Sequence, residues 1–320
     1  MANVRIGVVG AGVLGSYHIQ KCLKNKAVAC AGFYDVSPQR RAEISKKLGV
    51  DAFDDMDALI DASDACIVAT PSSTHAVVAT TCMNKNRHVL VEKPLAPSLP
   101  EGGALVALAR ERGIILHVGH SESFNAAFVK LQSFAPLPRF LEINRLAQYS
   151  PRGTDVSVIL DLMVHDLQLV LRLLGEEPCY DAIAATGVPV VSADIDIANV
   201  RIPFPSGCVV NCTASRISAK RMRKLRLFAR DNYFSVDLDK EEIERYSLTS
   251  PVVPGKPLPV EVSKEKPRHV DALEAELAAF VAAVVGTPGA AGVDGEEALR
   301  VLKVTDTIMA LLMNQNSDSV

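Results

Sequence analysis

An acid and a base lie one helical turn apart in the segment VILDLMVHDLQLVLRLLG, residues 158–175. The segment is apolar enough to form a helix, and on a helix Asp161 and His165 share one face. The carboxylate can orient the imidazole or stabilise its charge, and so keep it available as a base near neutral pH. Asp161 and His165 are therefore candidate catalytic residues.

The same helix has a second interpretation. One polar stripe runs along it and consists of Asp161, His165, Gln168 and Arg172, as a solvent-exposed helix face does. Both interpretations hold together if the first half of the stripe faces an interdomain cleft while Gln168 and Arg172 face water. Asp166 points away from the stripe and is expected to be structural.

A dinucleotide-binding signature lies at the start of the chain. The β-branched run VRIGVV (4–9) predicts a buried parallel strand, and it leads into GAGVLG (10–15) and a helical stretch. In such a unit Gly10 permits the tight turn, Gly12 lets the backbone approach a pyrophosphate, and Gly15 allows close packing of helix on strand. The cofactor-binding residues predicted in this loop are Gly10, Gly12, Val13, Leu14 and Gly15.

An acidic residue ends the second predicted strand, VACAGFYD (28–35). Asp35 follows Gly15 by twenty residues, the spacing at which an acid accepts hydrogen bonds from the adenosine ribose. Its carboxylate would repel a 2′-phosphate, which favours NAD over NADP. Arg40 and Arg41 lie close enough in sequence to reach such a phosphate, so NADP stays an alternative.

Further predicted strands cover 50–53, 65–69, 88–91 and 114–118, with helices between them. In an open α/β sheet, ligands bind outside the carboxyl ends of the strands. Lys93 follows the strand at 88–91 and is therefore expected at the same edge as the glycine loop, where Pro94 keeps the chain extended. A lysine in an isolated loop is more often a solvated charge.

The pattern changes after residue 120. A strand is predicted within 137–150, a helix at 156–175 and several strands from 180 to about 263, and two helices near 269–286 and 295–314 complete the chain. We expect an α/β protein in which residues 1–120 form a doubly wound, parallel NAD(P)-binding Rossmann domain. Residues 121–320 are expected to form a substrate-binding and oligomerisation domain with a large open mixed or antiparallel sheet. The Pro-rich stretch 251–259 is predicted to be a surface loop.

Composition limits the class of protein. The chain has 320 residues and a formal net charge of −3, which gives no global attraction to nucleic acid or membranes. The basic run KRMRKLR (220–226) lacks interleaved aromatic residues and is better interpreted as a charged strand face. The 7 cysteines have no metal-ligand spacing, so no metal site is expected. Without a signal peptide or a long apolar segment, the protein is expected to be soluble and cytoplasmic.

Five ordered motifs resemble one family. They are GAGVLG, Asp35, ATPSSTH (69–75), EKP (92–94) and LDLMVHD (160–166), and together they resemble the Gfo/Idh/MocA oxidoreductases over nearly the whole chain. The resemblance implies a Rossmann domain, a second domain whose open sheet forms a homodimer or homotetramer interface, and NAD(P)-dependent oxidation of a secondary alcohol.

The resemblance also implies roles for individual residues. Lys93 matches the family's EKP lysine, His165 its acid–base histidine, and Asp161 the acid one turn earlier. Cofactor contacts are implied for Arg40, Thr70, Pro71, His75, Glu92 and Lys93. Oxidation of a CH–OH group requires a base and a cation at one oxygen, so His165 would accept the proton while Lys93 stabilises alkoxide character.

The stretch GHSESFNAAF (119–128) is similar to the branch that oxidises the 3-hydroxyl of UDP-N-acetylglucosamine, although Ser123 and Ala126 replace the expected Arg and Pro. Arg145 and Arg152 are candidates for a diphosphate; exposed structural charges are the alternative. The expected substrate-binding residues are Lys93, Glu122, Arg145, Arg152, Asp161 and His165. Two other functions stay open: an oxidoreductase for a non-sugar substrate of the inositol, dihydrodiol or biliverdin type, and a non-catalytic NAD-binding regulator.

Overall fold

The computed structural model describes residues 3–134, 137–150 and 157–317. The chain forms two compact units. The first combines Met1–Ser121 with Asp271–Leu302, and the second combines Glu122–Val270 with Lys303–Val320. The sequence interpretation had placed all of 121–320 in the second domain. Residues 271–302 lie in the first unit because Leu277 and Phe280 share a buried core with Ile19.

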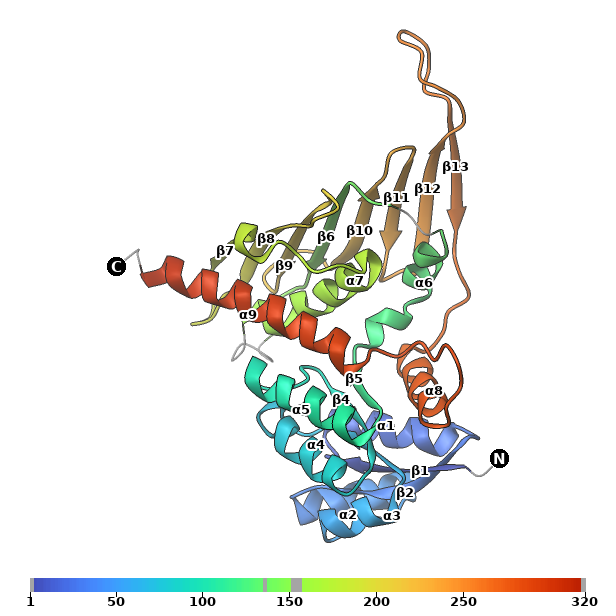
Figure 1. Cartoon of the computed structure of the whole chain (residues 1–320), viewed down its shortest axis with the longest axis vertical. Helices are drawn as coiled ribbons and strands as arrows, with labels where there is room; N and C mark the ends of the chain where they lie inside the picture. The colour runs from blue at the N-terminus through green and yellow to red at the C-terminus, as the bar shows by residue number, and fades with distance from the viewer. Residues whose placement is uncertain (1–2, 135–136, 151–156, 318–320) are drawn as a thin grey trace. The chain divides into compact units, whose positions relative to one another are not determined.

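A five-stranded parallel sheet forms the centre of the first unit (Figure 1). Its order is β2-β1-β3-β4-β5, with the strands β1 (Val4–Val9), β2 (Val28–Tyr34), β3 (Ala65–Val68), β4 (His88–Glu92) and β5 (Leu116–Gly119). All four residues of β3 and of β5 are buried, as expected of a sheet covered on both faces. The predicted strand at 50–53 is reduced to a single bridge, Phe33 with Ala52.

Helices cover this sheet. They are α1 (Val13–Lys24), α2 (Pro38–Leu48), α3 (Met56–Ala62), α4 (His75–Asn84), α5 (Leu99–Arg112) and α8 (Ala272–Val284), with the short helix η1 (Ser72–Thr74) before α4. Side chains of Ser37, Asp55 and Ser98 cap three helix N-termini. Two helices end at a left-handed glycine, Gly49 and Gly113.

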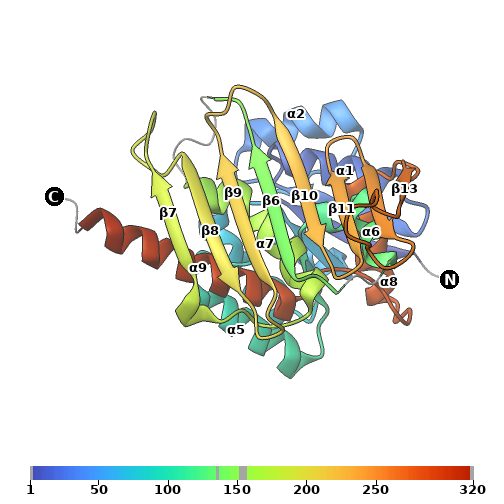
Figure 2. The ribbon, with the colours of Figure 1, turned by 90° about the horizontal axis from the view of Figure 1, so that it is seen from above.

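The second unit contains an eight-stranded sheet (Figure 2). Its order is β13-β12-β11-β10-β6-β9-β8-β7. The strands are β6 (Phe140–Leu146), β7 (Ala184–Val188), β8 (Ile197–Pro203), β9 (Val209–Ser215), β10 (Met222–Phe228), β11 (Asn232–Asp237), β12 (Glu242–Leu248) and β13 (Val260–Glu265). Only β6 and β9 pair in parallel among these described strands. The sheet is therefore mixed, as predicted.

One face of this sheet is covered by helices and the other is open (Figure 2). The covering elements are η2 (Ser121–Phe124), α6 (Ala126–Ser133), η3 (Ile159–Met163), α7 (Val164–Leu174), η4 (Tyr180–Ala182) and the second half of α9 (Gly295–Ser317). Burial alternates along β6 and β8 accordingly. The stretch 251–259 lies in the loop between β12 and β13, as predicted.

The helix predicted at 156–175 is not uniform over its described residues, 157–175. Ile159–Met163 forms one π-helical segment, which continues as α7 and ends at left-handed Gly175. The expectation that Gln168 faces water is wrong, because its side chain is fully buried and accepts a hydrogen bond from Ser123 at 2.7 Å. Asp166 is buried and ion-paired, as a structural residue would be. No helix of the described residues has the length and apolarity to span a membrane.

Candidate active site

The glycine loop has the geometry of a dinucleotide-binding turn. Gly10 has φ +94°, a conformation that other residues rarely adopt, and a Cβ there would lie 2.6 Å from the Ala69 carbonyl oxygen. A Cβ on Gly15 would lie 2.0 Å from the carbonyl oxygen of Gly10, so α1 packs against the turn only without a side chain. Around Gly12 a Cβ would meet nothing within 4 Å.

Gly12 is also the N-cap of α1, and no side chain of the described residues caps this helix. The first N–H groups of α1 therefore have no capping side chain, and the open space around Gly12 lets a phosphate approach them closely. Val13 and Leu14 beside it are exposed apolar residues. The loop consequently fits the pyrophosphate of a dinucleotide.

Asp35 stands at the end of β2, next to this loop. Its carboxylate accepts hydrogen bonds from the backbone N–H of Ala11 at 2.8 Å and of Ser37 at 2.9 Å. The acid is thus fixed beside the glycine loop by two backbone donors, and it stays half-buried. This position matches the one that a ribose-binding acid requires.

The two arginines after Asp35 have different partners. Arg40 donates from Nε to the carbonyl oxygen of Ala11 at 2.8 Å and pairs with Glu43 at 3.1 Å. Arg41 donates to the carbonyl oxygen of Asp35 and pairs with Asp54. Arg40 therefore lies at the glycine loop, but its guanidinium already has a carboxylate partner.

The carboxyl ends of the parallel strands bring the other predicted cofactor residues to the same edge. Val68 pairs with Val9 and with Val91, so Thr70 and Lys93 follow neighbouring strands at matching heights. Thr70 accepts a hydrogen bond from Thr74 at 2.9 Å, and Pro71 precedes η1 as an exposed residue. Both lie within three residues of the end of β3.

His75 connects two of these loops. Its Nδ1 lies 2.7 Å from the Pro94 carbonyl oxygen and its Nε2 lies 3.0 Å from the Thr70 carbonyl oxygen. The side chain is 1 % exposed. His75 therefore holds the loop after β3 to the Lys93-Pro94 turn, and it acts from behind the edge rather than from its surface.

The EKP turn is built around a cis bond between Lys93 and Pro94. Lys93 is half-buried, whereas Glu92 is buried with its Oε1 2.6 Å from Nε2 of His18. Glu276 of α8 lies in the same cluster. Glu92 thus points into the interior of the first unit, although the sequence predicts a cofactor contact for this residue.

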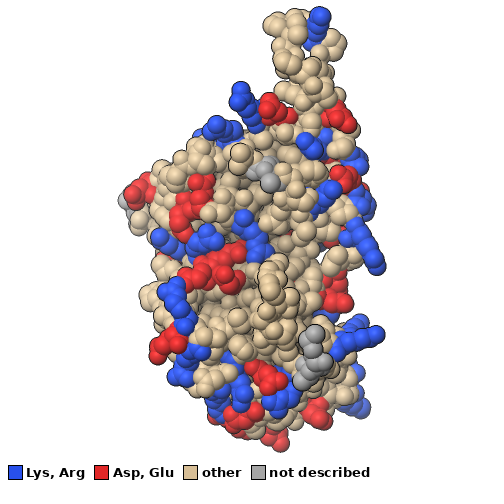
Figure 3. Space-filling model, turned by 45° about the vertical axis from the view of Figure 1, so that its right-hand side comes forward, with Lys and Arg blue, Asp and Glu red and all other residues tan. Residues whose placement is uncertain are grey.

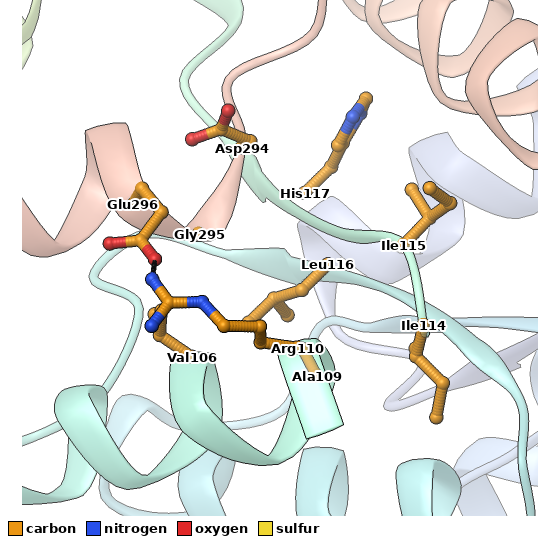
Figure 4. A pocket seen from close by; sticks show the side chains of 10 residues that line it. All are labelled: Val106, Ala109, Arg110, Ile114, Ile115, Leu116, His117, Asp294, Gly295 and Glu296. Carbon is orange, nitrogen blue, oxygen red and sulfur yellow. Dashed lines mark hydrogen bonds and ion pairs between the residues drawn. The ribbon is translucent and has the colours of Figure 1, made fainter. Parts of the chain in front are cut away.

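A pocket with a volume of about 270 Å³ lies in the first unit but not at this edge (Figure 4). Its lining includes Ile114, His117 and Asp294, which belong to the amino-terminal end of β5 and the segment before α9. An ion pair between Arg110 and Glu296 borders it. The pocket is separate from the glycine loop because the two lie at opposite ends of the strands.

In the second unit, Asp161 lies within the π-helical segment and His165 in the first turn of α7. Both side chains are half-buried. π-helical turns occur often at functional sites because they change which side chains share a face. Asp161 and His165 therefore lie on one continuous helical stretch, as predicted, while their shared face and their roles stay predictions.

The structure also brings Glu122 and Arg145 together, within a network of charges. Arg145 is 2 % exposed and contacts Asp166 at 2.7 Å and Glu122 at 3.2 Å, while Arg223 contacts Glu122 at 2.7 Å. Burial alone would lower the pKa of Arg145, but the charges of Asp166 and Glu122 raise it above its ordinary value. Arg152 lies outside the described residues.

Sequence reasoning missed His18, Glu276 and Arg223. Arg223 belongs to the basic run interpreted as a strand face, and β10 indeed contains it. A histidine inside an apolar helix face gives no signal of a carboxylate partner that lies 74 residues further along the chain. Glu276 gave no signal because an acid on a helix is usually solvent-exposed.

Comparison with known proteins agrees with this geometry. Residues 4–120 match the family model described as the oxidoreductase family with an NAD-binding Rossmann fold, Gfo/Idh/MocA. A UDP-N-acetylglucosamine 3-dehydrogenase from Acidithiobacillus ferrooxidans is 37% identical over 285 residues, which is 89% of this chain and 90% of the relative. A myo-inositol 2-dehydrogenase from Thermotoga maritima is 28% identical over 64% of this chain and 66% of its own length.

Solved structures extend the comparison. A crystal form of the Acidithiobacillus ferrooxidans UDP-N-acetylglucosamine 3-dehydrogenase superposes with a TM-score of 0.90 at 35% identity, covering 98% of this chain and 99% of that one. The match includes both units. The chain therefore belongs to the Gfo/Idh/MocA family of NAD-binding oxidoreductases.

Proposed function

We propose that the protein oxidises the 3-hydroxyl of UDP-N-acetylglucosamine with NAD. The observation that carries this proposal is the 37% identity to a UDP-N-acetylglucosamine 3-dehydrogenase over 89% of the chain. The glycine loop, Asp35 and the EKP turn support it, because they lie at one sheet edge of the first unit.

The cofactor would be held by the residues around the glycine loop. The N–H groups at the start of α1 would bind the pyrophosphate next to Gly12, and Asp35 would accept hydrogen bonds from the ribose. Thr70, Pro71 and Lys93 would border the nicotinamide half, with His75 fixing their loops from behind. When bound, the nicotinamide ring accepts the hydride from the substrate carbon.

The chain's own residues would manage the proton. His165 would take the proton of the substrate hydroxyl, and Asp161 would orient the imidazole or a neighbouring hydroxyl. Lys93, as an ammonium group, would donate a hydrogen bond to the same oxygen and stabilise its developing negative charge. In the reverse direction His165 would return the proton.

Arg145, a candidate from the sequence for the diphosphate, is not proposed to bind it, because its guanidinium is 2 % exposed and already paired with Asp166 and Glu122. Glu122 is engaged in the same network. Arg152 is the arginine proposed to contact the diphosphate.

We also propose that the protein is a cytoplasmic homodimer or homotetramer that assembles through the open face of the eight-stranded sheet. An aromatic row crosses that face on β6, β10, β11 and β12, formed by Phe140, Phe228, Tyr233 and Tyr246. A row of this kind is typical of surfaces that are buried on association.

The proposal is tested by NADH formation, measured by absorbance with NAD and NADP in parallel. The substrates are UDP-N-acetylglucosamine, UDP-glucose, myo-inositol and free N-acetylglucosamine. We expect turnover with UDP-N-acetylglucosamine and NAD. Turnover with myo-inositol alone would keep the reaction class and contradict the substrate, and no turnover across the panel would favour a non-sugar substrate or a regulator.

A further inference from the structure

Three ionisable side chains meet in the interior of the first unit. His18 of α1, Glu92 of β4 and Glu276 of α8 are 0 %, 8 % and 4 % exposed. One nitrogen or oxygen atom from each lies within 4.8 Å of the others. Ionisable groups are rarely buried together, because each loses its hydration unless a partner replaces it.

Glu92 is fixed on several sides. The 2.6 Å contact between its Oε1 and Nε2 of His18 requires a proton between the two atoms. Its Oε2 accepts the backbone N–H of Lys93 at 3.3 Å. A Cβ on Gly119, its neighbour on β5, would lie 2.7 Å from that same oxygen, so the carboxylate occupies the space that a side chain would need.

Glu276 differs from Glu92 in its contacts. Within the described part of the chain, neither of its carboxylate oxygens has a hydrogen-bond partner. Burial, and then the charge of Glu92, raise the pKa of Glu276 well above its ordinary value. A neutral acid at this place avoids a second negative charge beside Glu92.

The surrounding charges do not alter this conclusion. On α1, Lys21 pairs with Asp271 at 2.5 Å and lies 3.8 Å from Glu274, so its ammonium group offsets one of these two carboxylates at the exposed start of α8. On β5, the ring of His117 contacts Phe280, one turn after Glu276. Among the described His, Cys, Asp and Glu residues, His18 and Glu92 are the two that meet Glu276 in this cluster, and Glu92 is the charge that raises its pKa.

A bound cation is the alternative occupant of such a cluster. Ligand atoms at about 2.0 to 2.2 Å from one Zn²⁺ ion stand roughly 3 Å or more from each other. The nitrogen and oxygen of His18 and Glu92 are closer than that, at the distance of a charge-assisted hydrogen bond. The cluster therefore has the geometry for holding protons.

We propose that His18 is a positioning residue for Lys93: it holds the carboxylate of Glu92, and with it the Lys93-Pro94 turn, beside a Glu276 that stays uncharged. The inference rests on the catalytic role proposed for Lys93. The statement that Glu276 stays uncharged does not depend on any enzymatic activity, so it can be tested separately.

The protonation is tested by stability against pH. A group whose pKa is raised on folding contributes fully to the stability of the fold below its unfolded pKa, and this contribution is lost as the pH rises toward its folded pKa. The side chain in Glu276→Gln is neutral at every pH, so this variant takes up no proton at that position when it folds. We expect the difference between the thermal midpoints of Glu276→Gln and wild type to grow by about 2 °C per pH unit from about pH 5 upward.

The matched control is Asp271→Asn, on the same helix. Asp271 caps α8 and its pKa is lowered, first by the hydrogen bond from Lys21, so it is ionised in both folded and unfolded states above about pH 6. Its variant should therefore lose a constant amount of stability over that range. A constant difference for Glu276→Gln as well would overturn the neutral acid. Wild-type stability that falls with a chelator, with Glu276→Gln insensitive to it, would show a cation site instead.

The positioning is tested by kinetics on UDP-N-acetylglucosamine. His18→Leu leaves Glu92 without its donor, and kcat should fall about tenfold or more with little change in KM. His18→Gln restores an N–H at similar reach and should recover most of kcat. Equal kcat values for His18→Leu and wild type would overturn the positioning role, and so would full activity of Lys93→Ala. Absence of any wild-type turnover would instead contradict the proposed function, while the pH test of Glu276 still applies.

Discussion

At the scale of single residues, the side chains proposed to act on the substrate hydroxyl come from different parts of the chain. Asp161 and His165 lie in the second unit, on one helical stretch, whereas Lys93 lies at the cofactor edge of the first unit. The proposed mechanism has the imidazole and the ammonium group act on one oxygen. None of the three residues belongs to the glycine loop, so each can be tested without disturbing that loop.

His165→Ala should remove the base and leave the cofactor-binding residues in place. We expect kcat to fall about 100-fold or more, because general-base catalysis contributes roughly 10² to 10⁴. The dissociation constant for NAD, measured by calorimetry, should stay within about threefold of wild type. A large loss of NAD binding would contradict the assignment of His165 to the substrate.

Asp35→Ser should change the cofactor preference. The carboxylate accepts N–H groups of Ala11 and Ser37 and repels a 2′-phosphate, while Arg40 lies nearby and can pair with such a phosphate. We expect the ratio of kcat/KM for NAD to that for NADP to fall at least tenfold. Asp57→Ser, which removes an exposed partner of Lys85, is the control and should leave the ratio unchanged.

At the scale of elements, short-range patterns were sufficient for the parallel sheet. The run VRIGVV, the glycines and Asp35 predict strand, turn, helix and strand, and the structure has each of them. The π-helical turn at Ile159–Met163 could not be predicted, because the apolar periodicity of an α-helix continues through it. Gln168 was misjudged for a related reason: the polar partner that makes its burial acceptable, Ser123, lies 45 residues away.

Two glycines of the same loop should behave differently. Gly15→Ala places a Cβ against the Gly10 carbonyl oxygen, so we expect a lower thermal midpoint together with weak NAD binding. Gly12→Ala meets open space and should leave the thermal midpoint nearly unchanged, while the added methyl group weakens NAD binding. Thermal unfolding and NAD titration of both variants measure this. Equal destabilisation by the two substitutions would contradict the described turn.

At the scale of the whole molecule, composition predicted a chain with two cores but not how the chain divides between them. Residues 271–302 lie in the first unit because contacts such as those of Leu277 and Phe280 with α1 join segments about 260 residues apart, beyond any local pattern. The cluster of His18, Glu92 and Glu276 forms only because residues 271–302 belong to the first unit, so local sequence patterns could not predict it.

The face in Figure 3 shows positive and negative side chains intermixed, as the small net charge of −3 leads one to expect.

The open face of the eight-stranded sheet makes a prediction for assembly. Phe228 lies on that face, is 37 % exposed and contacts Phe140 and Tyr233. If copies associate through the aromatic row, Phe228→Glu should place a charge in the interface and lower the molar mass measured by light scattering. Val77→Glu, an exposed site on α4 of the first unit, is the control. An unchanged mass for Phe228→Glu would exclude this face as the interface.

The most direct test of the central claim follows the hydride itself. UDP-N-acetylglucosamine with deuterium at C3 is incubated with the protein and NAD, and the NADH formed is analysed by mass spectrometry. We expect one deuterium in each NADH that the wild type forms, and no NADH formation by the variant that combines Lys93→Ala with His165→Ala. Unlabelled NADH would show that another carbon is oxidised, and no NADH at all would contradict the proposed dehydrogenase activity on this substrate.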